Sequence, residues 1–410
     1  MAWRTRWIGG GCWGVILAAA AACEGTADDE SAVDGAADSG VAGSPGAPGS
    51  GGVLGSAGST GSGGSAAETV GQRTLLLDTS ASGANVTETV THYPLAVRLG
   101  ADDVDFSAAG PDGSGLRFTQ NGHPLPYEVE LWDAVGRTAL VWILVDEVLG
   151  ATAAQELELS WGEVESSAGP VFATADGFYG VWHLNEDGNT AEGGYHDASE
   201  HGGHGTGVGL APGSSVPARL GRGTRLENPT GQNTARWVRV SGEKASAYNP
   251  DGPLTVSIWA LAKSYPIYSY ETIFSKGDTS WSLQRVTYEP DRGYQSCLLA
   301  GSGTTYHFCI YDFEKQPLVT DEWLHFMLVL DEPSMRLYID GELNAEGSGY
   351  SWNQGSHPLG IGNQTQFDGR RQWDGILDEA RVMRAARPAA WAKLDYESQR
   401  EQQTLVSWAQ

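Results

Sequence analysis

The stretch Trp323-Leu-His-Phe-Met-Leu-Val-Leu-Asp331 is apolar on both faces of an extended strand. Alternate residues of a strand share a face, which gives Leu324, Phe326, Leu328 and Leu330 on one side and Met327 and Val329 on the other. Such a strand belongs in the middle of a packed sheet. The next segment, Arg336-Leu-Tyr-Ile-Asp-Gly341, predicts a neighbouring strand after the turn Asp331-Glu-Pro-Ser334, and its Asp340-Gly341 pair signals a further hairpin.

Other short apolar blocks lie on both sides of this hairpin. They are Val181-Trp-His-Leu-Asn-Glu186, Leu254-Thr-Val-Ser-Ile-Trp-Ala260, Ile273-Phe-Ser-Lys276, Leu359-Gly-Ile-Gly362 and Trp373-Asp-Gly-Ile-Leu-Asp-Glu-Ala-Arg-Val382. Together with the hairpin they resemble the laminin-G-like domains, which are jelly rolls related to concanavalin A. The resemblance spans residues 170–399 and implies a sandwich of two β-sheets. It implies no particular ligand or reaction, because one fold hosts many functions.

A short helix is expected at the end of this region. Trp391, Leu394 and Tyr396 recur at near-helical spacing within residues 388–403, which predicts a helix packed against the sandwich.

A second, smaller β-sandwich is expected at residues 73–166. Leu157-Glu-Leu-Ser-Trp161 alternates as a half-buried strand does, whereas Leu140-Val-Trp-Ile-Leu-Val145 is apolar throughout. With Gly115-Leu-Arg-Phe118 and Leu125-Pro-Tyr-Glu-Val-Glu-Leu-Trp132, these blocks resemble the bacterial domain of unknown function 2341. That family has no established chemistry to carry over. The predicted fold class is therefore all-β: a small β-sandwich, then a concanavalin A-like jelly roll with a short C-terminal helix.

The first 23 residues have the pattern of a secretory signal. Arg4 and Arg6 precede a mostly apolar run that ends in Ala20-Ala-Ala-Cys23. This ending resembles the lipobox of bacterial lipoproteins, which implies lipidation at Cys23, although position −3 lacks the usual Leu. The alternative is ordinary cleavage after an alanine. Because Glu24 replaces the Asp that resembles an inner-membrane retention signal, an outer-membrane lipoprotein is the predicted destination, on its periplasmic or cell-surface side.

Residues 24–72 are rich in Gly, Ala, Ser and Pro and carry acidic residues. Nothing in them can bury a core, so a disordered linker is expected. A flexible chain of this length has an r.m.s. span of roughly 35–40 Å and would hold the folded part away from a lipid surface.

Composition excludes one class of partner. The chain has 25 Lys+Arg against 51 Asp+Glu, a formal net charge of −26 in 410 residues. Such a surface repels phosphate backbones, so nucleic-acid binding is not expected.

Two of the four cysteines are candidates for a disulfide. If the segment between Cys297 and Cys309 is a hairpin that turns near residues 301–303, the two thiols face each other across the strands. An oxidising compartment favours the bond, and two buried free thiols are the alternative.

No catalytic motif stands out. Retaining glucanases of this fold are characterised by the motif Glu-x-Asp-x-x-Glu. The segment here that most resembles it is Glu289-Pro-Asp-Arg-Gly-Tyr294, which lacks the last acid. Asp378 and Glu379 are neighbours on one predicted strand, so their carboxylates should point to opposite faces and not form a catalytic pair. We therefore expect a protein that is not an enzyme.

The sequence offers two candidate metal sites. His196, His201 and His204 crowd one loop, where solvated turn histidines are the favoured interpretation over a zinc site. The resemblance to laminin-G-like domains implies calcium more readily, with Asp197 and Asp378 as candidate ligands. The alternative is that both aspartates only accept backbone hydrogen bonds.

Aromatic loops supply the ligand-binding candidates. Tyr265, Tyr268, Tyr270 and Trp352 could stack on sugar rings, or could simply cover the end of the sandwich. The leading functional hypothesis is an exported, lipid-anchored surface protein that binds a glycan or an envelope protein without catalysis, as in carbohydrate binding or cell adhesion. The alternatives are an envelope polysaccharide hydrolase or lyase and a structural scaffold.

Overall fold

In a computed structural model of the chain, the apolar stretch at residue 323 forms a central strand. This strand, β18 (Trp323–Asp331), lies between β13 (Leu254–Ala262) and β19 (Ser334–Ile339). Asp340 and Gly341 both have positive φ, and the hairpin continues into β20 (Glu342–Ser348) as predicted. The structure describes residues 71–162, 169–228, 235–265, 270–277, 280–287, 292–299, 307–316, 318–351, 353–367 and 370–410.

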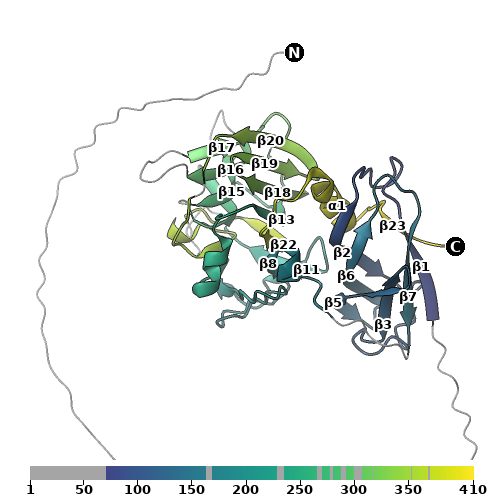
Figure 1. The fold of residues 1–410 in the computed structure, drawn as a ribbon. Coiled ribbons are helices and arrows are strands. Elements are labelled where there is room, and N and C mark those ends of the chain that lie inside the picture. The colour runs from purple at the N-terminus through teal and green to yellow at the C-terminus, as the bar shows by residue number, and fades with distance from the viewer. Residues whose placement is uncertain are drawn as a thin grey trace, which may run out of the picture. The chain divides into compact units, whose positions relative to one another are not determined.

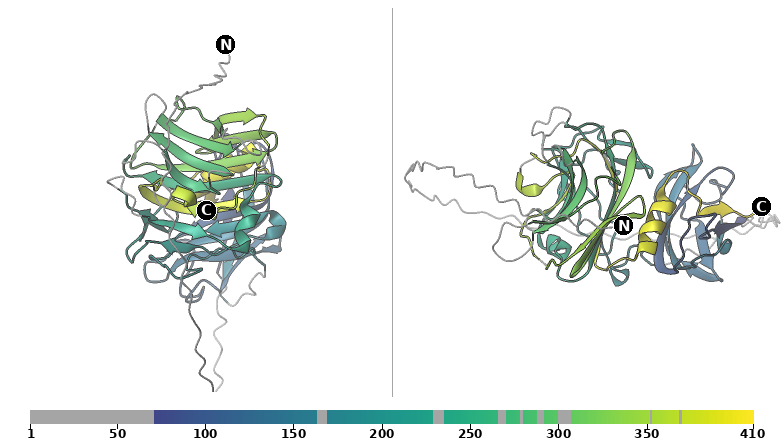
Figure 2. Two further views of the ribbon diagram at one scale, coloured as in Figure 1. Left: turned by 90° about the vertical axis from the view of Figure 1, so that its left-hand side faces the viewer. Right: turned by 90° about the horizontal axis from the view of Figure 1, so that it is seen from above.

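Two facing sheets build the jelly roll around this hairpin (Figures 1 and 2). The first has the order β10-β11-β22-β13-β18-β19-β20, with β8 paired to β22; its remaining strands are β8 (Phe178–Trp182), β10 (Ser215–Pro217), β11 (Arg222–Leu226) and β22 (Gly375–Met383). The second has the order β17-β16-β15-β14-β21-β12-β9; its strands are β9 (Thr206–Val208), β12 (Trp237–Val240), β14 (Tyr270–Ser275), β15 (Trp281–Thr287), β16 (Arg292–Leu299), β17 (His307–Ile310) and β21 (Leu359–Ile361). Three short 3-10 helices, η1 (Thr174–Asp176), η2 (Glu243–Tyr248) and η3 (Thr365–Phe367), lie in the connections.

The smaller β-sandwich precedes the jelly roll in the chain. One sheet has the order β23-β1-β7-β3-β4 and the other β2-β6-β5; the strands are β1 (Gly71–Leu77), β2 (Val90–Leu99), β3 (Leu116–Gln120), β4 (His123–Leu125), β5 (Tyr127–Asp133), β6 (Thr138–Val148), β7 (Gln155–Trp161) and β23 (Val406–Trp408). The all-β class with two sandwiches is thus confirmed. Strand β1 begins at Gly71, two positions before the expected start at Arg73.

The last residues of the chain return to the first sandwich. After α1 (Ala389–Gln399), strand β23 pairs with β1, with Leu75 opposite Trp408. The helix at residue 389 agrees with the prediction, and Trp391 and Leu394 are buried. The pairing of β23 was not predicted, because three residues carry too little pattern to announce a strand.

The strands that are apolar on both faces have a common explanation. In β18, the Leu324 face belongs to the jelly-roll core, whereas Met327 and Val329 belong to a second core that also contains Trp142 of β6 and Trp391 of α1. Residues 65–410 form one compact unit. A strand needs a second apolar face when another layer covers it, and here the smaller sandwich and α1 share that layer.

The predicted cross-strand disulfide is present. Cys297 of β16 lies opposite Cys309 of β17, and the two sulfurs are bonded.

Two further sequence-based interpretations lie outside the described residues. These are the signal and lipidation site at Cys23 and the linker up to residue 70. Among the described residues, no helix has both the length and the apolar character that crossing a membrane requires.

Candidate functional site

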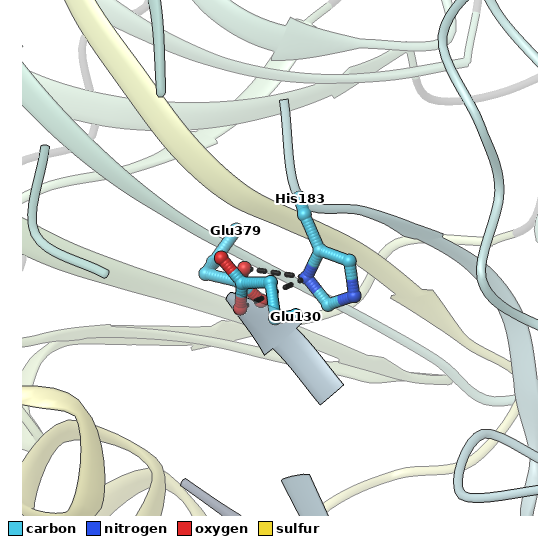
Figure 3. A group of neighbouring side chains, drawn as sticks. All are labelled: Glu130, His183 and Glu379. Atoms are coloured by element: carbon cyan, nitrogen blue, oxygen red, sulfur yellow. Dashed lines mark hydrogen bonds and ion pairs between the residues drawn. The ribbon is translucent and has the colours of Figure 1, made fainter. Parts of the chain in front are cut away.

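A buried histidine and two carboxylates meet where the two sandwiches join (Figure 3). Glu130 comes from β5, His183 follows β8, and Glu379 lies in β22. The Nδ1 atom of His183 lies 2.6 Å from Oε1 of Glu379 and 3.5 Å from Oε2 of Glu130. The three side chains are 10%, 1% and 0% exposed, in the order His183, Glu130, Glu379.

A β-bulge directs Glu379 into this cluster. The pairing of β13 with β22 shifts register beside Glu379, which has a φ of 51°. Leu377 and Ala380 both pack in the jelly-roll core, so the two acidic residues between them lie on the other face of the sheet. The expectation that Asp378 and Glu379 point to opposite faces is therefore wrong, because it assumed an unbroken alternation.

Arg381 extends the cluster to the C-terminal helix. Its guanidinium donates to Oε2 of Glu379 at 2.8 Å and to Oδ1 of Asp395 at 3.2 Å. His325 of β18 lies on the far side of Asp395, with 3.2 Å between Nε2 and Oδ2. The guanidinium carbon of Arg381 also lies 4.3 Å from the ring centre of Trp142. Side chains from both sandwiches and the helix thus form one buried network.

The environment separates the proton affinities of the two glutamates. Burial raises the pKa of Glu130 to about 8 even though His183 and a hydrogen bond from Trp142 act in the opposite direction. Burial also acts to raise the pKa of Glu379, but His183 and Arg381 outweigh it and lower that pKa. Burial alone would lower the pKa of His183, yet the neighbouring carboxylates hold it well above its ordinary value. A charged His183–Glu379 pair beside a neutral Glu130 therefore describes the cluster at neutral pH.

Burial likewise raises the pKa of Asp378, and the charge of Glu379 raises it further. A neutral Asp378 is consistent with its single hydrogen bond, which Oδ2 accepts from the backbone N–H of Leu220 at 2.7 Å.

The cluster fits shared protons better than a metal ion. Tetrahedral zinc, with bonds of about 2.0–2.2 Å to nitrogen and oxygen, keeps its ligand atoms roughly 3.3 Å apart. The 2.6 Å between His183 and Glu379 is a hydrogen-bond length instead. The positively charged guanidinium of Arg381 also lies against Glu379, and its charge would repel a cation bound there.

The same cluster brings two carboxylates close together. The ligand oxygens of Glu130 and Glu379 lie within 4.8 Å of each other, and retaining glycosidases hold their carboxyl groups about 5 Å apart. Both side chains are nearly inaccessible, however, and their oxygens are engaged by Trp142, His183 and Arg381. A polysaccharide needs access that this position does not offer.

The two calcium candidates belong to different hydrogen-bond sets. Oδ1 of Asp197 accepts from the backbone N–H groups of Val181 and Ser199, and Oδ2 accepts from that of Gly203. Asp378 contacts none of these groups in the described structure. Calcium at Asp197 and Asp378 stays a prediction, and the geometry gives it no support.

The histidines of the first loop are also engaged separately. Nδ1 of His204 accepts from the backbone N–H of Asp197 at 3.0 Å, and Nε2 of His201 lies 3.1 Å from the carbonyl of Lys244. Among the described residues, the group close enough to share a metal is Glu130, His183 and Glu379, the junction cluster. It contains neither His201 nor His204.

Of the two aromatic candidates among the described residues, Tyr265 is the more exposed. The residue is 36% exposed, and its ring stacks on the guanidinium of Arg285, 4.4 Å from the ring centre. Arg285 in turn pairs with buried Glu271 and stacks on Trp373. The ring of Tyr270 packs against Arg371. Tyr268 and Trp352 lie outside the described residues.

A cavity of about 280 Å³ lies at the other end of strand β14. Three connections line it: the end of β12 with η2, the residues after β14, and the residues before β21. The lining residues are Ser241, Gly242, Ala245, Ser246, Asn249, Lys276, Gly355, Ser356, His357 and Pro358. Tyr265 precedes β14 and Lys276 follows it, so the exposed tyrosine and the cavity are separated by a strand of about 20 Å.

Local contacts hold the cavity wall in place. Trp281 donates its indole N–H to the carbonyl of Tyr248 at 2.8 Å, which fixes η2 to β15. Oδ1 of Asn249 accepts from the backbone N–H of Gly355 at 2.9 Å and joins two of the three connections.

Lys276 is the charged group of the cavity. The residue is 2% exposed, and its ammonium donates to the carbonyls of Gly355, at 3.0 Å, and His357. Burial lowers its pKa to about 8. In the sequence, Lys276 only ends the predicted strand Ile273-Phe-Ser-Lys276. No motif signals its place in the cavity, because the lining residues come from three separate segments.

Of the comparisons with known proteins, the family match agrees with the jelly roll. No curated protein matches the sequence. Among solved structures, domain 4 of AbnA, a GH43 extracellular arabinanase from Geobacillus stearothermophilus, in complex with arabinotriose, is 15% identical, covers 53% of this chain and 97% of its own, and has a TM-score of 0.38. The binding domain of Paraclostridial Mosquitocidal Protein 1 is 14% identical over 53% of this chain and 52% of its own, with a TM-score of 0.39.

Neither structural match supports a function for this chain at such identities and scores. The family comparison matches one region, residues 233–393, which covers most of the jelly roll and includes the residues that line the cavity. Residues 233–393 match the family model Laminin_G_3, of the concanavalin A-like lectin/glucanases superfamily.

Proposed function

We propose that this protein is a non-catalytic binding module whose jelly roll recognises a glycan or an envelope protein. The cavity at the end of β14 carries the proposal, because it combines a polar lining with a rigid wall on a lectin-type fold. Specific recognition of sugars needs such preplaced polar groups, since sugars offer many hydroxyls and little apolar surface.

The cellular setting is part of the proposal. The signal pattern and Cys23 support export and a lipid anchor, with the acidic linker as a spacer. Metabolic labelling with a radioactive fatty acid tests this, with label expected on the wild-type protein and lost in Cys23→Ala.

A glycan array and a pull-down from envelope extracts test binding, each performed with calcium and with a chelator. We expect at least one glycan or protein to be retained by the wild-type protein. Blank results in both assays under both conditions would refute the binding function.

The hydrolase or lyase alternative has one observation in its favour, the spacing of Glu130 and Glu379. Release of reducing ends from a polysaccharide panel, lost in Glu379→Gln, would establish it. Because both carboxyl groups are buried in the junction, we expect no release.

A further inference from the structure

We propose that the cavity around Lys276 binds the carboxylate of an acidic saccharide, with the Lys276 ammonium as its charge partner. The inference rests on the proposed binding function and specifies the class of ligand.

The first argument is that no carboxylate of the described residues pairs with Lys276. Three lysine and arginine residues are buried in the described part of the chain: Lys276, Arg285 and Arg381. Arg285 pairs with Glu271, and Arg381 pairs with Glu379 and Asp395. Lys276 instead contacts two backbone carbonyls. A buried charge without a partner is costly, and a bound carboxylate would compensate it.

The second argument is the donor set. An ammonium group has three hydrogens, and two of those of Lys276 point to the carbonyls of Gly355 and His357. The third is left for a group in the cavity. Ser241, Ser246 and Ser356 are among the residues that line the same space, and serine side chains suit the hydroxyls of a sugar ring.

The third argument concerns size and charge. A volume of about 280 Å³ is at the low end for small-molecule sites and holds about one sugar residue. The net charge of −26 repels polyanions at a distance, but salt screens this field beyond roughly 8 Å. One carboxylate matches one ammonium, whereas a phosphate dianion would bring a charge that the site does not balance. A saccharide with a single or terminal acid is therefore favoured.

The pH dependence of binding follows from the state of Lys276. Its pKa of about 8 leaves the ammonium charged at pH 7 and mostly neutral at pH 9.5. The preference for an acidic ligand should then decline over this range.

The test compares acidic and neutral sugars on the intact protein. Oligosaccharides ending in glucuronate, galacturonate or N-acetylneuraminate, and their neutral counterparts, are titrated by calorimetry at pH 7. We expect at least one acidic compound to bind tenfold or more tightly than its counterpart, and Lys276→Met to abolish this preference.

A matched control is Lys315→Met. The ammonium of Lys315 also donates to two backbone carbonyls, of Leu343 at 3.4 Å and Asn344 at 3.0 Å, but it is 58% exposed and lies 3.6 Å from Asp312. This variant should keep the preference. Should Lys276→Met fail to fold, Ser246→Tyr fills the cavity from an exposed position and should weaken binding of every compound in the panel.

The outcomes separate this inference from the proposed function. Binding of neutral compounds with no preference for any acid, or a preference that survives in Lys276→Met, overturns the Lys276 assignment and leaves the binding module intact. No binding of any glycan, with blank array and pull-down results, overturns both.

Discussion

Charged side chains are buried both at the junction and in the cavity, but the two regions differ in the partners that these charges have. At the junction, Arg381 and His183 each face a carboxylate within hydrogen-bond distance. In the cavity, the partners of the Lys276 ammonium among the described residues are two backbone carbonyl oxygens. Buried charge that is paired resists separation, whereas buried charge that is unpaired gains from a partner. This difference is the reason why we assign a structural role to the junction and propose a binding role for the cavity.

The largest expected effect on stability comes from a substitution that disrupts the buried network at the junction. Arg381→Met leaves Glu379 without one partner and removes a partner of Asp395, so we expect the free energy of unfolding to fall by about 3–5 kcal/mol. Arg336→Met is the matched control, because Arg336 pairs with Asp331 at the surface at 3.8 Å and should cost less than about 1 kcal/mol. Chemical denaturation of both variants measures the difference. Equal losses would contradict a structural role for the buried network.

The pH dependence of stability sharpens the comparison. Folding raises the pKa of Glu130 to about 8, so between about pH 4.5 and 8 the folded state holds a proton that the unfolded state has released. The free energy of unfolding should therefore fall as pH rises through that window, by at most about 1.4 kcal/mol per unit. Folding also raises the pKa of His183, so the free energy of unfolding falls further as pH rises above the ordinary pKa of histidine.

Glu130→Gln tests this assignment, since the amide keeps an acceptor for Trp142 but cannot titrate. We expect its unfolding midpoint to fall less between pH 5 and 8 than that of the wild-type protein. Glu88→Gln makes the same carboxyl-to-amide change at an exposed position and should leave the slope unchanged. A slope in Glu130→Gln as steep as the wild-type slope would refute the proton at Glu130.

At the cavity, the expected effect on stability is smaller. Lys276→Met removes two hydrogen bonds but also a desolvated charge, so the free energy of unfolding at pH 7 should change by less than about 1 kcal/mol. Because folding lowers the pKa of Lys276 to about 8, wild-type stability gains with pH between about 8 and 10.5, and the variant should lose that gain. Denaturation curves at pH 7 and 10 check both statements. A loss at pH 7 as large as that of Arg381→Met would mean that the lysine is structural.

Calcium should have the smallest effect. The oxygens of Asp197 already accept three backbone N–H groups, and Asp378 favours its protonated form. We expect millimolar calcium to move the unfolding temperature by less than about 1 °C relative to a chelator. A larger rise that Asp197→Asn abolishes would instead establish the calcium site.

Strands and the disulfide could be predicted because their signals are local. The apolar pattern over nine residues predicted β18, and a two-residue turn predicted β20. The spacing of Cys297 and Cys309 predicted their bond. The junction cluster could not be predicted, since Glu130, His183 and Glu379 come from three distant segments. A bulge, which no residue pattern marked, also moved Glu379 to the face opposite the one that regular alternation assigns.

The sequence by itself determined the all-β class, the central hairpin and the acidic character, because periodicity and composition act over neighbouring residues. It also showed that β6 and β18 are apolar on both faces, without revealing what covers the second face. Only the tertiary structure decided that the two sandwiches share a core, that the charges buried between them are paired, and that Lys276 contacts backbone carbonyls and no carboxylate of the described residues. Burial and charge pairing depend on which distant segments meet, and that is a property of the packed chain.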